Sequence, residues 1–193
     1  MIRFLDIIAS ICGLIILSPL FIILGIWIKL DSKGPIFYKQ IRVGQYGKDF
    51  ALYKFRSMRV GADKKGLITV GGKDNRITKV GYFIRKYKLD EFPQLLNVLK
   101  GDMSLVGPRP HMLKHTDEYS ALIDNYLVRH WVKPGITGWA QVTGFRGETE
   151  ELYQMEGRVK ADIWYMEHWS FLLDLFIIYK TFANVIIGEE KAY

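Results

Sequence analysis

The longest apolar run of the chain lies near its N-terminus, where residues 7–28 carry no charged side chain. At about 1.5 Å of rise per residue, a helix of this length can span the hydrocarbon core of a bilayer. Ser18 and Pro19 stand near the middle of the run, and a proline inside a helix removes one backbone hydrogen bond and bends the axis. The pattern predicts a membrane helix over residues 1–30 with a break at Ser18-Pro19.

Basic residues flank both ends of this run and bear on its topology. One precedes it and four follow it: Arg3, and then Lys29, Lys33, Lys39 and Arg42. Because basic residues beside a membrane helix favour the cytoplasm, we expect a re-entrant helix that enters and leaves by one face, with the Ser18 hydroxyl binding backbone groups freed at the break. A kinked spanning helix and a buried core helix are the alternatives. A signal peptide is disfavoured, because no small-residue cleavage site follows.

The rest of the chain, residues 31–193, has the pattern of one mixed and mainly helical domain, and no flexible linker divides it. Short apolar runs at 36–38 and 50–53, with Gly44 and Gly47 between them, indicate a β-hairpin. Helices are expected over 77–88, 91–100, 112–131 and, with an interruption, 148–187. Residues 61–76 are rich in glycine and charge and are expected to form a mobile surface loop. The fold class is therefore α+β.

Aromatic residues gather near the C-terminus among a few polar ones. The aromatic set is Trp164, Tyr165, Trp169, Phe171, Phe176, Tyr179 and Phe182. Aromatic side chains mixed with charges suit the headgroup level of a membrane, so we expect amphipathic interfacial helices here. An ordinary core helix with an aromatic face explains the same pattern equally well.

Composition and charge limit the classes of protein that remain. A chain of 193 residues with 49% hydrophobic residues has enough apolar material for a packed domain, which excludes general disorder. The single cysteine, Cys12, excludes a disulfide framework and fits a reducing compartment. The net charge is +7, and it is uneven: residues 1–100 hold 18 basic and 7 acidic residues, whereas residues 101–193 hold 9 and 13. The basic half adjoins the apolar run.

Two adjacent acids, Asp90 and Glu91, are the main candidates for chemistry. Pro93 suits the first turn of a helix and Gly101 suits the position after its end, so Asp90 is expected at or near a helix N-cap, where the helix dipole and nearby cations such as Arg85 stabilise a carboxylate. Such a pair can share a divalent cation or divide into nucleophile and support. Taken alone, it is more commonly a capping aspartate followed by a first-turn glutamate.

Arg109 favours a chemical role for the two acids over a capping role, because it stands between Pro108 and Pro110. The prolines restrict the backbone around it, and a guanidinium held in this way suits bidentate recognition of phosphate. Residues 54–59 offer further cations, and residues 133–139 predict a tight turn that leads to an aromatic residue. Acids, rigid cations and a membrane anchor together indicate phosphate chemistry at a bilayer surface.

Three motifs then identify the chain as similar to a known family. They are Lys54-Phe55-Arg56-Ser57-Met58, Asp90-Glu91-Phe92-Pro93-Gln94 through Gly107-Pro108-Arg109-Pro110, and Lys133-Pro134-Gly135-Ile136-Thr137-Gly138-Trp139-Ala140-Gln141-Val142. In this order they resemble the bacterial sugar transferases, which are monotopic phosphoglycosyl transferases. The resemblance covers nearly the whole chain and includes the Ser18-Pro19 break.

The resemblance implies an enzyme that moves a hexose-1-phosphate from a UDP-sugar to undecaprenyl phosphate. UMP is released, and the product primes exopolysaccharide, capsule or O-antigen synthesis. By the same resemblance Asp90 is the nucleophile that forms a covalent phospho-sugar intermediate, Glu91 is its partner, and both hold Mg²⁺. Arg85 and Arg109 fall at phosphate-binding positions, and Arg56 stands where the family often has lysine. The implied location is the cytoplasmic face of the bacterial inner membrane, in contact with its lipids.

The choice of sugar rests on weaker similarities. Residues 144–149 and 188–193 resemble the hexose-1-phosphate branch of the family more than the branch that uses N-acetylated sugars, so glucose is expected first and galactose next, with Arg146 contacting the nucleotide-sugar. Members of that branch often carry additional N-terminal helices and an extra domain. The chain is thus a naturally short member, as Met1 favours, or a piece of a longer protein. A homodimer is left open.

Rival chemistries fit the sequence less well. His111 and His115 lack the glutamate of the zinc-protease pattern, and Gly71-Gly72-Lys73 lacks the spacing of a phosphate-binding P-loop. A membrane-tethered nucleic-acid binder would use the positive charge, but no aromatic platform is interleaved with the cations, so no nucleic acid is expected. A metal-dependent glycosyltransferase, which would release UDP, usually carries Asp-x-Asp, and the sequence contains none.

Overall fold

The computed structural model describes residues 2–62, 74–147 and 151–187. It confirms the mainly helical α+β class and the expected hairpin. The α-helices are α1 (Ile2–Asp31), α2 (Lys79–Lys86), α3 (Gln94–Lys100), α4 (Leu113–Ser120), α5 (Trp139–Val142), α6 (Leu152–Glu167) and α7 (Phe171–Ile187). The short 3₁₀ helices are η1 (Gln45–Gly47), η3 (Leu89–Glu91) and η4 (Tyr126–Trp131), and the strands are β1 (Phe37–Val43), β2 (Asp49–Phe55), β3 (Ser104–Val106) and β4 (Gly135–Thr137).

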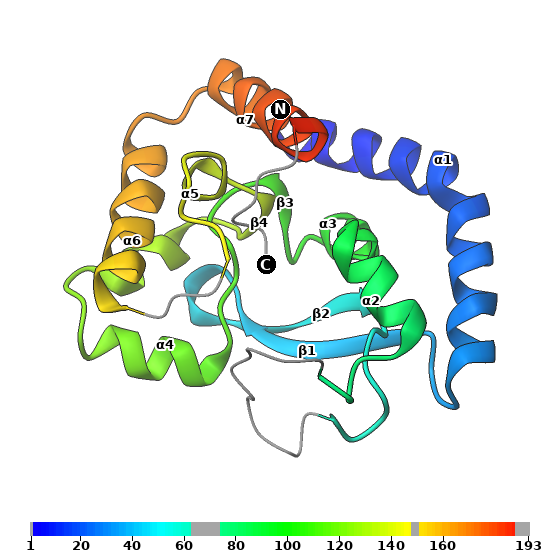
Figure 1. Ribbon diagram of the computed structural model, residues 1–193. Helices are drawn as coiled ribbons and strands as arrows, with labels where there is room; N and C mark the ends of the chain where they lie inside the picture. Colours follow the sequence, from blue (N-terminus) through cyan, green and yellow to red (C-terminus); the bar gives the residue numbers. More distant parts are fainter. Residues whose placement is uncertain (1, 63–73, 148–150, 188–193) are drawn as a thin grey trace.

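The hairpin of β1 and β2 lies in the lower part of the view in Figure 1. Its strands are longer than the sequence predicted. The register pairs Phe37 with Phe55 and Val43 with Asp49. The turn between the strands needs left-handed backbone at two positions, and Gly47 supplies one of them without steric cost. One face of the sheet packs on α3 through a cluster of Phe50, Leu52, Val98 and Met103.

Helix α1 is continuous, and Figure 1 shows it as two arms that meet at a bend. Pro19 lies inside the helix and has no N–H to offer the carbonyl of Ile15, four residues earlier. The Ser18 hydroxyl donates to that same carbonyl at 2.8 Å. The expectation that Ser18 satisfies a group freed by the proline is therefore confirmed.

The first arm of α1 is tied to the body by two charged side chains. Arg3 donates to the carbonyls of Val98 and, at 2.8 Å, Leu99, in the last turn of α3. Asp6 is buried and accepts hydrogen bonds from the Ser104 hydroxyl at 2.8 Å and from the Leu105 N–H at 3.1 Å. The N-terminal end of the helix is thus held against α3 and β3.

The second arm is tied to the same body at its far end. Arg56, at the end of β2, is buried and donates to the carbonyls of Ile28, Ser32 and Lys33 at 2.6–3.3 Å. Asp31 accepts a hydrogen bond from the Val80 N–H in the first turn of α2. Leu24, Ile28, Phe55, Val80 and Ile84 form a buried cluster beneath this arm. Both ends of α1 therefore contact one compact body.

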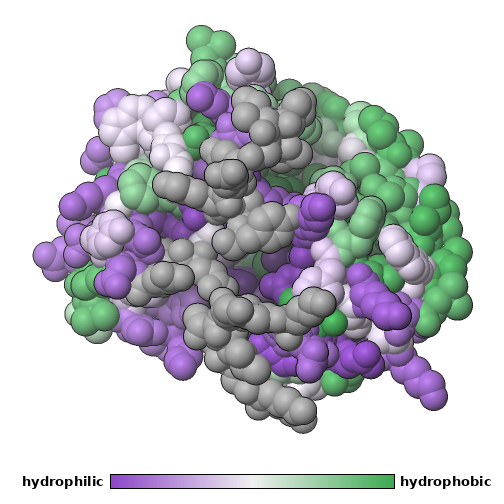
Figure 2. All heavy atoms as spheres, viewed as in Figure 1, coloured by the Kyte–Doolittle hydropathy of each residue, from purple (hydrophilic) through white to green (hydrophobic). Residues whose placement is uncertain are grey.

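The outer face of α1 is apolar and open. Ile15 and Ile16, beside the bend, are 67% and 75% exposed. Figure 2 shows hydrophobic residues gathered on the side of the molecule where this helix runs. Among the described residues, α1 is the one helix long and apolar enough to cross a membrane by length and composition.

Strands β3 and β4 form a parallel pair that the sequence did not predict. Gly107, Gly135 and Gly138 bring their backbones into direct contact: a Cβ at Gly135 would lie 2.1 Å from the Gly107 nitrogen, and one at Gly138 would lie 2.2 Å from the Gly107 oxygen. The expected tight turn over 133–139 is wrong, because Gly135 opens β4 and α5 begins at Trp139. We name these three residues the glycine contact.

The C-terminal helices follow the predicted pattern, with α6 and α7 separated at 168–170. Val106, Tyr165 and Ile177 form a buried cluster between them and β3. Asp174 is buried and accepts hydrogen bonds from the Tyr165 hydroxyl at 2.7 Å and from Trp169 at 3.0 Å. The outer face of α7 exposes Phe171, Leu172, Leu175, Phe176, Tyr179 and Phe182. Its place at a membrane surface stays a prediction.

The other predicted helices are interrupted or shorter. Residues 112–131 divide into α4 and η4, because Asn125 takes a left-handed conformation with φ of 59°. Residues 77–88 contain α2, capped by Thr78, whose side chain accepts from the Gly81 N–H. Most of the expected loop over 61–76, the Gly71-Gly72-Lys73 segment and residues 188–193 lie outside the described residues.

Candidate active site

Asp90 and Glu91 lie on η3, a tight turn between α2 and α3. The turn begins at Lys88, which has a left-handed backbone with φ of 55°, and α3 begins only at Gln94, after Pro93. Asp90 was expected at or near the N-cap of a helix over 91–100; in the structure it lies three residues before the N-cap, Pro93, because the 3₁₀ turn takes up residues 89–91. Gly101 ends α3 in the left-handed conformation, as predicted.

Two cations bind Glu91 directly. Arg109 donates to both carboxylate oxygens, at 2.6 and 3.3 Å, and Lys54 Nζ lies 2.8 Å from Oε1. Lys54 also lies 4.0 Å from Oδ2 of Asp90, within range for charge attraction but too far for a hydrogen bond. The Asp90 and Glu91 side chains are 13% and 19% exposed, so the acids are accessible from one side and otherwise enclosed.

The two carboxyl groups differ in their pKa. Burial raises the pKa of Asp90, and the neighbouring Glu91 charge adds to this, while Lys54 and Arg85 act against it. Burial would also raise the pKa of Glu91, but Arg109 and Lys54 outweigh it and hold that pKa well below its ordinary value. Glu91 is therefore the permanently ionised member of the pair, and Asp90 is the more basic carboxylate.

The backbone that follows the Arg109 side chain is fixed by two other arginines. Arg129, which is buried, donates to the carbonyl of Arg109 at 2.8 Å, and Arg42 donates to the carbonyl of Pro110 at 3.2 Å. The side chain of Arg109 is still 36% exposed. The proline-flanked segment thus presents a guanidinium that is held in position and open to solvent.

The predicted arginines differ in their placement. Arg85 is exposed on the last turn of α2 and acts on Asp90 through its charge. Arg56 does not reach the acids, because its guanidinium is used by the carbonyls at the end of α1. Lys54, on β2, is the cation that reaches Glu91, and substrate binding by Arg56 stays a prediction.

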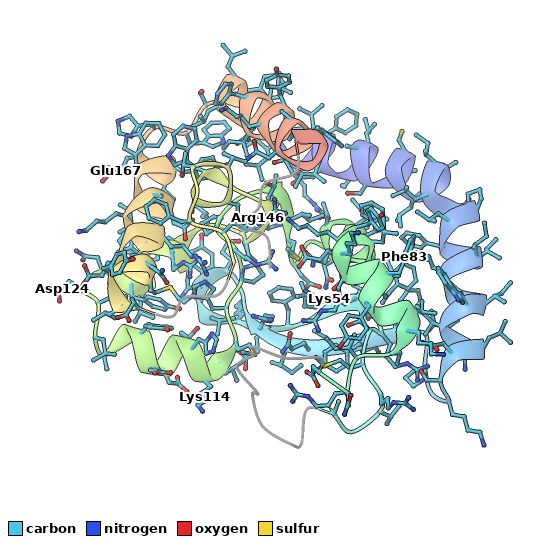
Figure 3. All side chains as sticks on the ribbon, in the orientation of Figure 1. Lys54, Phe83, Lys114, Asp124, Arg146 and Glu167 are labelled. Carbon is cyan, nitrogen blue, oxygen red and sulfur yellow. The ribbon has the colours of Figure 1, made fainter. Side chains whose placement is uncertain are left out.

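Arg146 lies on a turn after α5, between Gly144 and Gly147, which both have positive φ. Figure 3 shows Arg146 on the α5 side of the central region and Lys54 on the α2 side. The two labelled cations therefore come to the central region from different parts of the chain.

Sequence reasoning missed several cations that support the site. Lys54 was expected only as one of the further cations of residues 54–59, Arg42 only as a residue that follows the apolar run, and Arg129 and Arg158 had no expected role. Arg158 and Asp162 carried a usable signal, since they are four residues apart in a predicted helix and share a face with Met155. A charged pair on an otherwise apolar helix face indicates a buried polar network.

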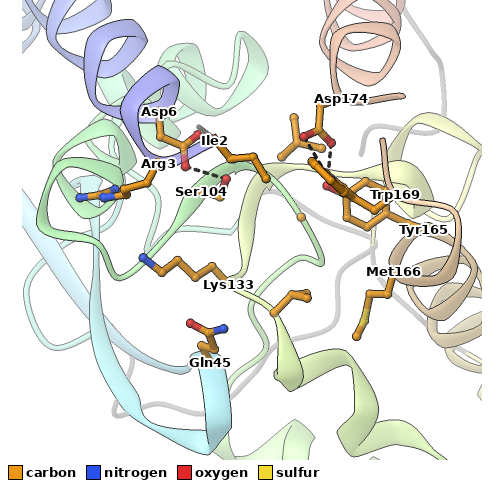
Figure 4. Close-up of a pocket in the computed structure, with 13 residues that line it drawn as sticks. Ile2, Arg3, Asp6, Gln45, Ser104, Lys133, Tyr165, Met166, Trp169 and Asp174 are labelled. Atoms are coloured by element: carbon orange, nitrogen blue, oxygen red, sulfur yellow. Dashed lines mark hydrogen bonds between the residues drawn. The ribbon is translucent and has the colours of Figure 1, made fainter. Parts of the chain in front are cut away.

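A separate cavity of about 320 Å³ lies between the start of α1, β3 and the start of α7 (Figure 4). Lys133 points toward it from one side, and Trp169 lies on the other. Its two carboxylates, Asp6 and Asp174, already have hydrogen-bond partners. Neither Asp90 nor Glu91 lines this cavity, so it is separate from the pair of acids.

The side chains of the site could hold magnesium only if phosphate oxygens of a bound substrate and water completed its coordination. The described residues contain no group of three histidine, cysteine or acidic side chains that could hold a metal. Magnesium, however, is often bound by one or two carboxylates and completed by phosphate oxygens and water. Asp90 fits this requirement, whereas both oxygens of Glu91 are bound to cations.

The sequence profile of the bacterial sugar transferases matches residues 1–188. The chain belongs to this family. The bacterial sugar transferase from Xanthomonas campestris pv. campestris named UDP-glucose:undecaprenyl-phosphate glucose-1-phosphate transferase is 48% identical over 97% of the chain and 39% of its own length.

Two further relatives show the range of names in this family. A protein from Aeromonas hydrophila, named UDP-N-acetylgalactosamine-undecaprenyl-phosphate N-acetylgalactosaminephosphotransferase, is 40% identical over 96% of the chain and 44% of its own length. The exopolysaccharide production protein PSS of Rhizobium leguminosarum bv. phaseoli is 40% identical over 94% of the chain and 93% of its own length. The chain spans about two fifths of the length of the first two relatives, and nearly all of the third.

Proposed function

We propose that this chain is a phosphoglycosyl transferase that moves a hexose-1-phosphate from a UDP-sugar to undecaprenyl phosphate. The observation that carries the proposal is the Asp90-Glu91 pair enclosed by Lys54, Arg85 and Arg109. Both substrates are anionic, and they would repel a carboxylate nucleophile unless cations compensated their charge. The names of the relatives support the same class of reaction.

In this proposal Asp90 acts as the nucleophile. Its carboxylate oxygen attacks the sugar-bearing phosphorus, a P–O bond forms to Asp90, and the bond to the bridging oxygen breaks so that UMP leaves. A phosphate oxygen of undecaprenyl phosphate then attacks the same phosphorus and frees Asp90. The raised pKa of Asp90 supports this role, because a more basic carboxylate donates its electron pair more readily.

Glu91 has a different role in the proposal. Its bidentate pair with Arg109 and its contact with Lys54 hold two cations beside Asp90. Because these cations keep its pKa low, Glu91 is poorly suited to carry a proton at neutral pH. We assign it the orientation of Arg109 and Lys54 toward the phosphates of the donor.

Magnesium is the proposed cofactor, with Asp90 as a protein ligand and Glu91 close by. When bound, it would neutralise charge on the phosphates of the donor. The cations of the chain itself, Lys54, Arg85 and Arg109, supply the remaining positive charge around the acids.

We further propose that α1 is re-entrant and that the protein lies on the cytoplasmic face of the bacterial inner membrane. Arg3 and Asp6 bind one end of α1 to the body, and Arg56 binds the other. A helix with both ends on one body cannot place them on opposite sides of a bilayer while these contacts hold. The open apolar face near the bend would then lie in the lipid.

Glucose is the preferred sugar, and an N-acetylated sugar is the alternative, since relatives with both kinds of name match the chain at 48% and 40% identity. The decisive experiment presents UDP-glucose, UDP-galactose and UDP-N-acetylgalactosamine with undecaprenyl phosphate and measures the released nucleotide. UMP supports the proposal, and the fastest donor names the sugar. Release of UDP would instead indicate a membrane-tethered glycosyltransferase.

The role of Asp90 has its own test. Asp90→Asn is expected to reduce UMP release to background and to leave the thermal unfolding midpoint near that of the wild type, because an amide is a poor nucleophile. Asp117→Asn, an exposed position on α4, is the matched control and should keep full activity. Labelled donor should leave a phospho-sugar on Asp90 in the wild type, and its absence would contradict the covalent step.

A further inference from the structure

The turn that carries Arg146 is held by one arginine of α6. Arg158 donates from Nε to the Phe145 carbonyl at 3.1 Å and from Nη2 to the Gly147 carbonyl at 2.9 Å. These two carbonyls flank Arg146 in the chain, so one guanidinium fixes the backbone on both sides of it. Gly157, next to Arg158, lets the turn pack closely, since a Cβ there would lie 2.2 Å from the Phe145 ring.

Arg158 in turn belongs to a buried network. Its side chain is on the same face of α6 as Asp162, one turn later, and both residues are buried. Oδ2 of Asp162 lies 2.7 Å from Nη2 of Arg129, the guanidinium that also donates to the Arg109 carbonyl. Asp162 therefore stands between the arginine that supports Arg109 and the arginine that supports Arg146.

The charges of the network agree with this arrangement. Burial lowers the pKa of Arg158 to about 10, and the nearby charges of Arg129 and Arg109 contribute in the same direction, while Asp162 opposes them. Arg158 therefore remains charged at neutral pH, with one buried carboxylate beside it. A buried guanidinium whose hydrogen bonds go to carbonyls serves to fix those carbonyls.

We propose that Arg158 is a positioning residue that sets Arg146 for binding of the nucleotide-sugar donor, with Asp162 coupling this turn to the Arg109 segment. The inference rests on the proposed function, in which the donor is a UDP-sugar. Arg158 itself touches no substrate in this arrangement: it acts through the two carbonyls that hold the turn.

The test is a double-mutant cycle between Arg146→Ala and Arg158→Met. Methionine keeps an unbranched stem but lacks the guanidinium and donates no hydrogen bond, so the turn is released; we expect KM for the UDP-sugar to rise about tenfold with a smaller change in kcat. If Arg158 acts through Arg146, the double variant should be no worse than Arg146→Ala alone. Independent effects that multiply in the double variant would overturn the proposal.

Further variants separate positioning from stability. Arg158→Lys keeps the charge beside Asp162 but loses the two-pronged donor geometry, so it should fold normally and still raise KM. Lys160→Met, an exposed position on the same helix, should change neither KM nor the thermal midpoint. A lowered midpoint with unchanged KM in both Arg158 variants would mean a merely structural role and would overturn the proposal.

The affinity of free UDP, measured by calorimetry, keeps this inference distinct from the proposed reaction. If wild-type protein binds UDP but releases no UMP, the proposed reaction is contradicted. The double-mutant cycle between Arg146→Ala and Arg158→Met can then still be measured from the Kd of UDP. Weaker UDP binding in Arg146→Ala, with a matching loss in Arg158→Met and in the double variant, supports the inference. Unchanged UDP binding and unchanged KM in Arg146→Ala would overturn it, because Arg158 would then have nothing to position.

Discussion

At the scale of single residues, the fork between Arg109 and Glu91 determines what the site can do. Two nearly parallel hydrogen bonds fix the guanidinium plane, and partial burial of both side chains strengthens the pair relative to one on an open surface. Lysine has the same charge but no planar fork. The geometry of Arg109, as well as its charge, should therefore matter for catalysis.

Arg109→Lys tests this point. We expect kcat/KM for the UDP-sugar to fall about 100-fold, because bidentate contact is lost while the charge is retained. Steady-state UMP release measures the effect. Lys114→Arg, an exposed change on α4, is the control and should behave as the wild type. Loss of less than about threefold in Arg109→Lys would show that charge alone is sufficient.

His130 offers a prediction on pH and stability. Burial and the neighbouring Arg129 lower the pKa of His130 from its ordinary value of 6.5 to about 4. Between these values the unfolded chain binds a proton that the folded chain does not, so falling pH favours unfolding. The free energy of unfolding of the wild type should therefore contain a contribution from neutral His130 that is lost as the pH falls from about 6.5 to about 4.

His130→Gln removes that component. Urea unfolding at several pH values should give a smaller loss of unfolding free energy on acidification in His130→Gln than in the wild type. Buried carboxyl groups with raised pKa, such as Asp162, act in the opposite direction in both proteins and cancel in the comparison. Parallel pH curves for the two proteins would contradict the assignment.

The residues that sequence reasoning found and those it missed differ in a physical way. Asp90, Glu91 and Arg109 stood in short motifs whose chemistry could be inferred without a fold. Lys54 and Arg56 are only two residues apart, and their different partners, Glu91 for Lys54 and the end of α1 for Arg56, depend on how that helix packs at the end of β2. The buried arginines of the supporting network required tertiary contacts in the same way.

At the scale of elements, α1 combines a bend with attachment at both ends. The helix, its proline and the role of Ser18 could be predicted from local sequence, because each depends on residues at most four positions apart. The parallel pairing of β3 with β4 could not, since it joins segments about 30 residues apart through glycine backbones. Short strands of this kind have too little hydrophobic pattern to be recognised.

Pro19→Ala tests the bend. Alanine restores the helical hydrogen bond and favours a straight helix, so a larger fraction of molecules should expose an N-terminal tag on the outer side of the membrane. Impermeant labelling of the tag in intact cells measures this fraction.

Combining Pro19→Ala with Arg3→Ala should increase the labelled fraction further, because Arg3 anchors the first arm to α3. Ser18→Ala, which keeps the proline, is the control. A tag that stays protected in all variants would show that the proline does not determine the topology.

At the scale of the whole molecule, exposed apolar side chains gather on α1 and α7, and Figure 2 shows hydrophobic residues along the side where α1 runs. A surface of this kind is too apolar to be stable in water and suits lipid. The proposed membrane contact predicts that the residues beside the bend contribute most to attachment.

Ile16→Asp tests that contribution. A carboxylate at the centre of a bilayer costs about 2.5–3.5 kcal/mol, so the variant should move from the membrane pellet toward the soluble fraction in cell fractionation. Leu127→Asp, with a similarly exposed side chain on η4, is the matched control and should stay in the pellet. Equal release of both variants would point to misfolding rather than to lost lipid contact.

The glycine contact has a practical consequence for anyone who wishes to redesign donor preference. Gly107 lies two residues before Arg109, and its backbone touches that of Gly135 and Gly138, so an added methyl group there is expected to shift the Arg109 segment relative to Glu91. Libraries aimed at new sugars should leave this junction untouched and also keep Gly144, because its φ of 98° disfavours any side chain although the space around it is open.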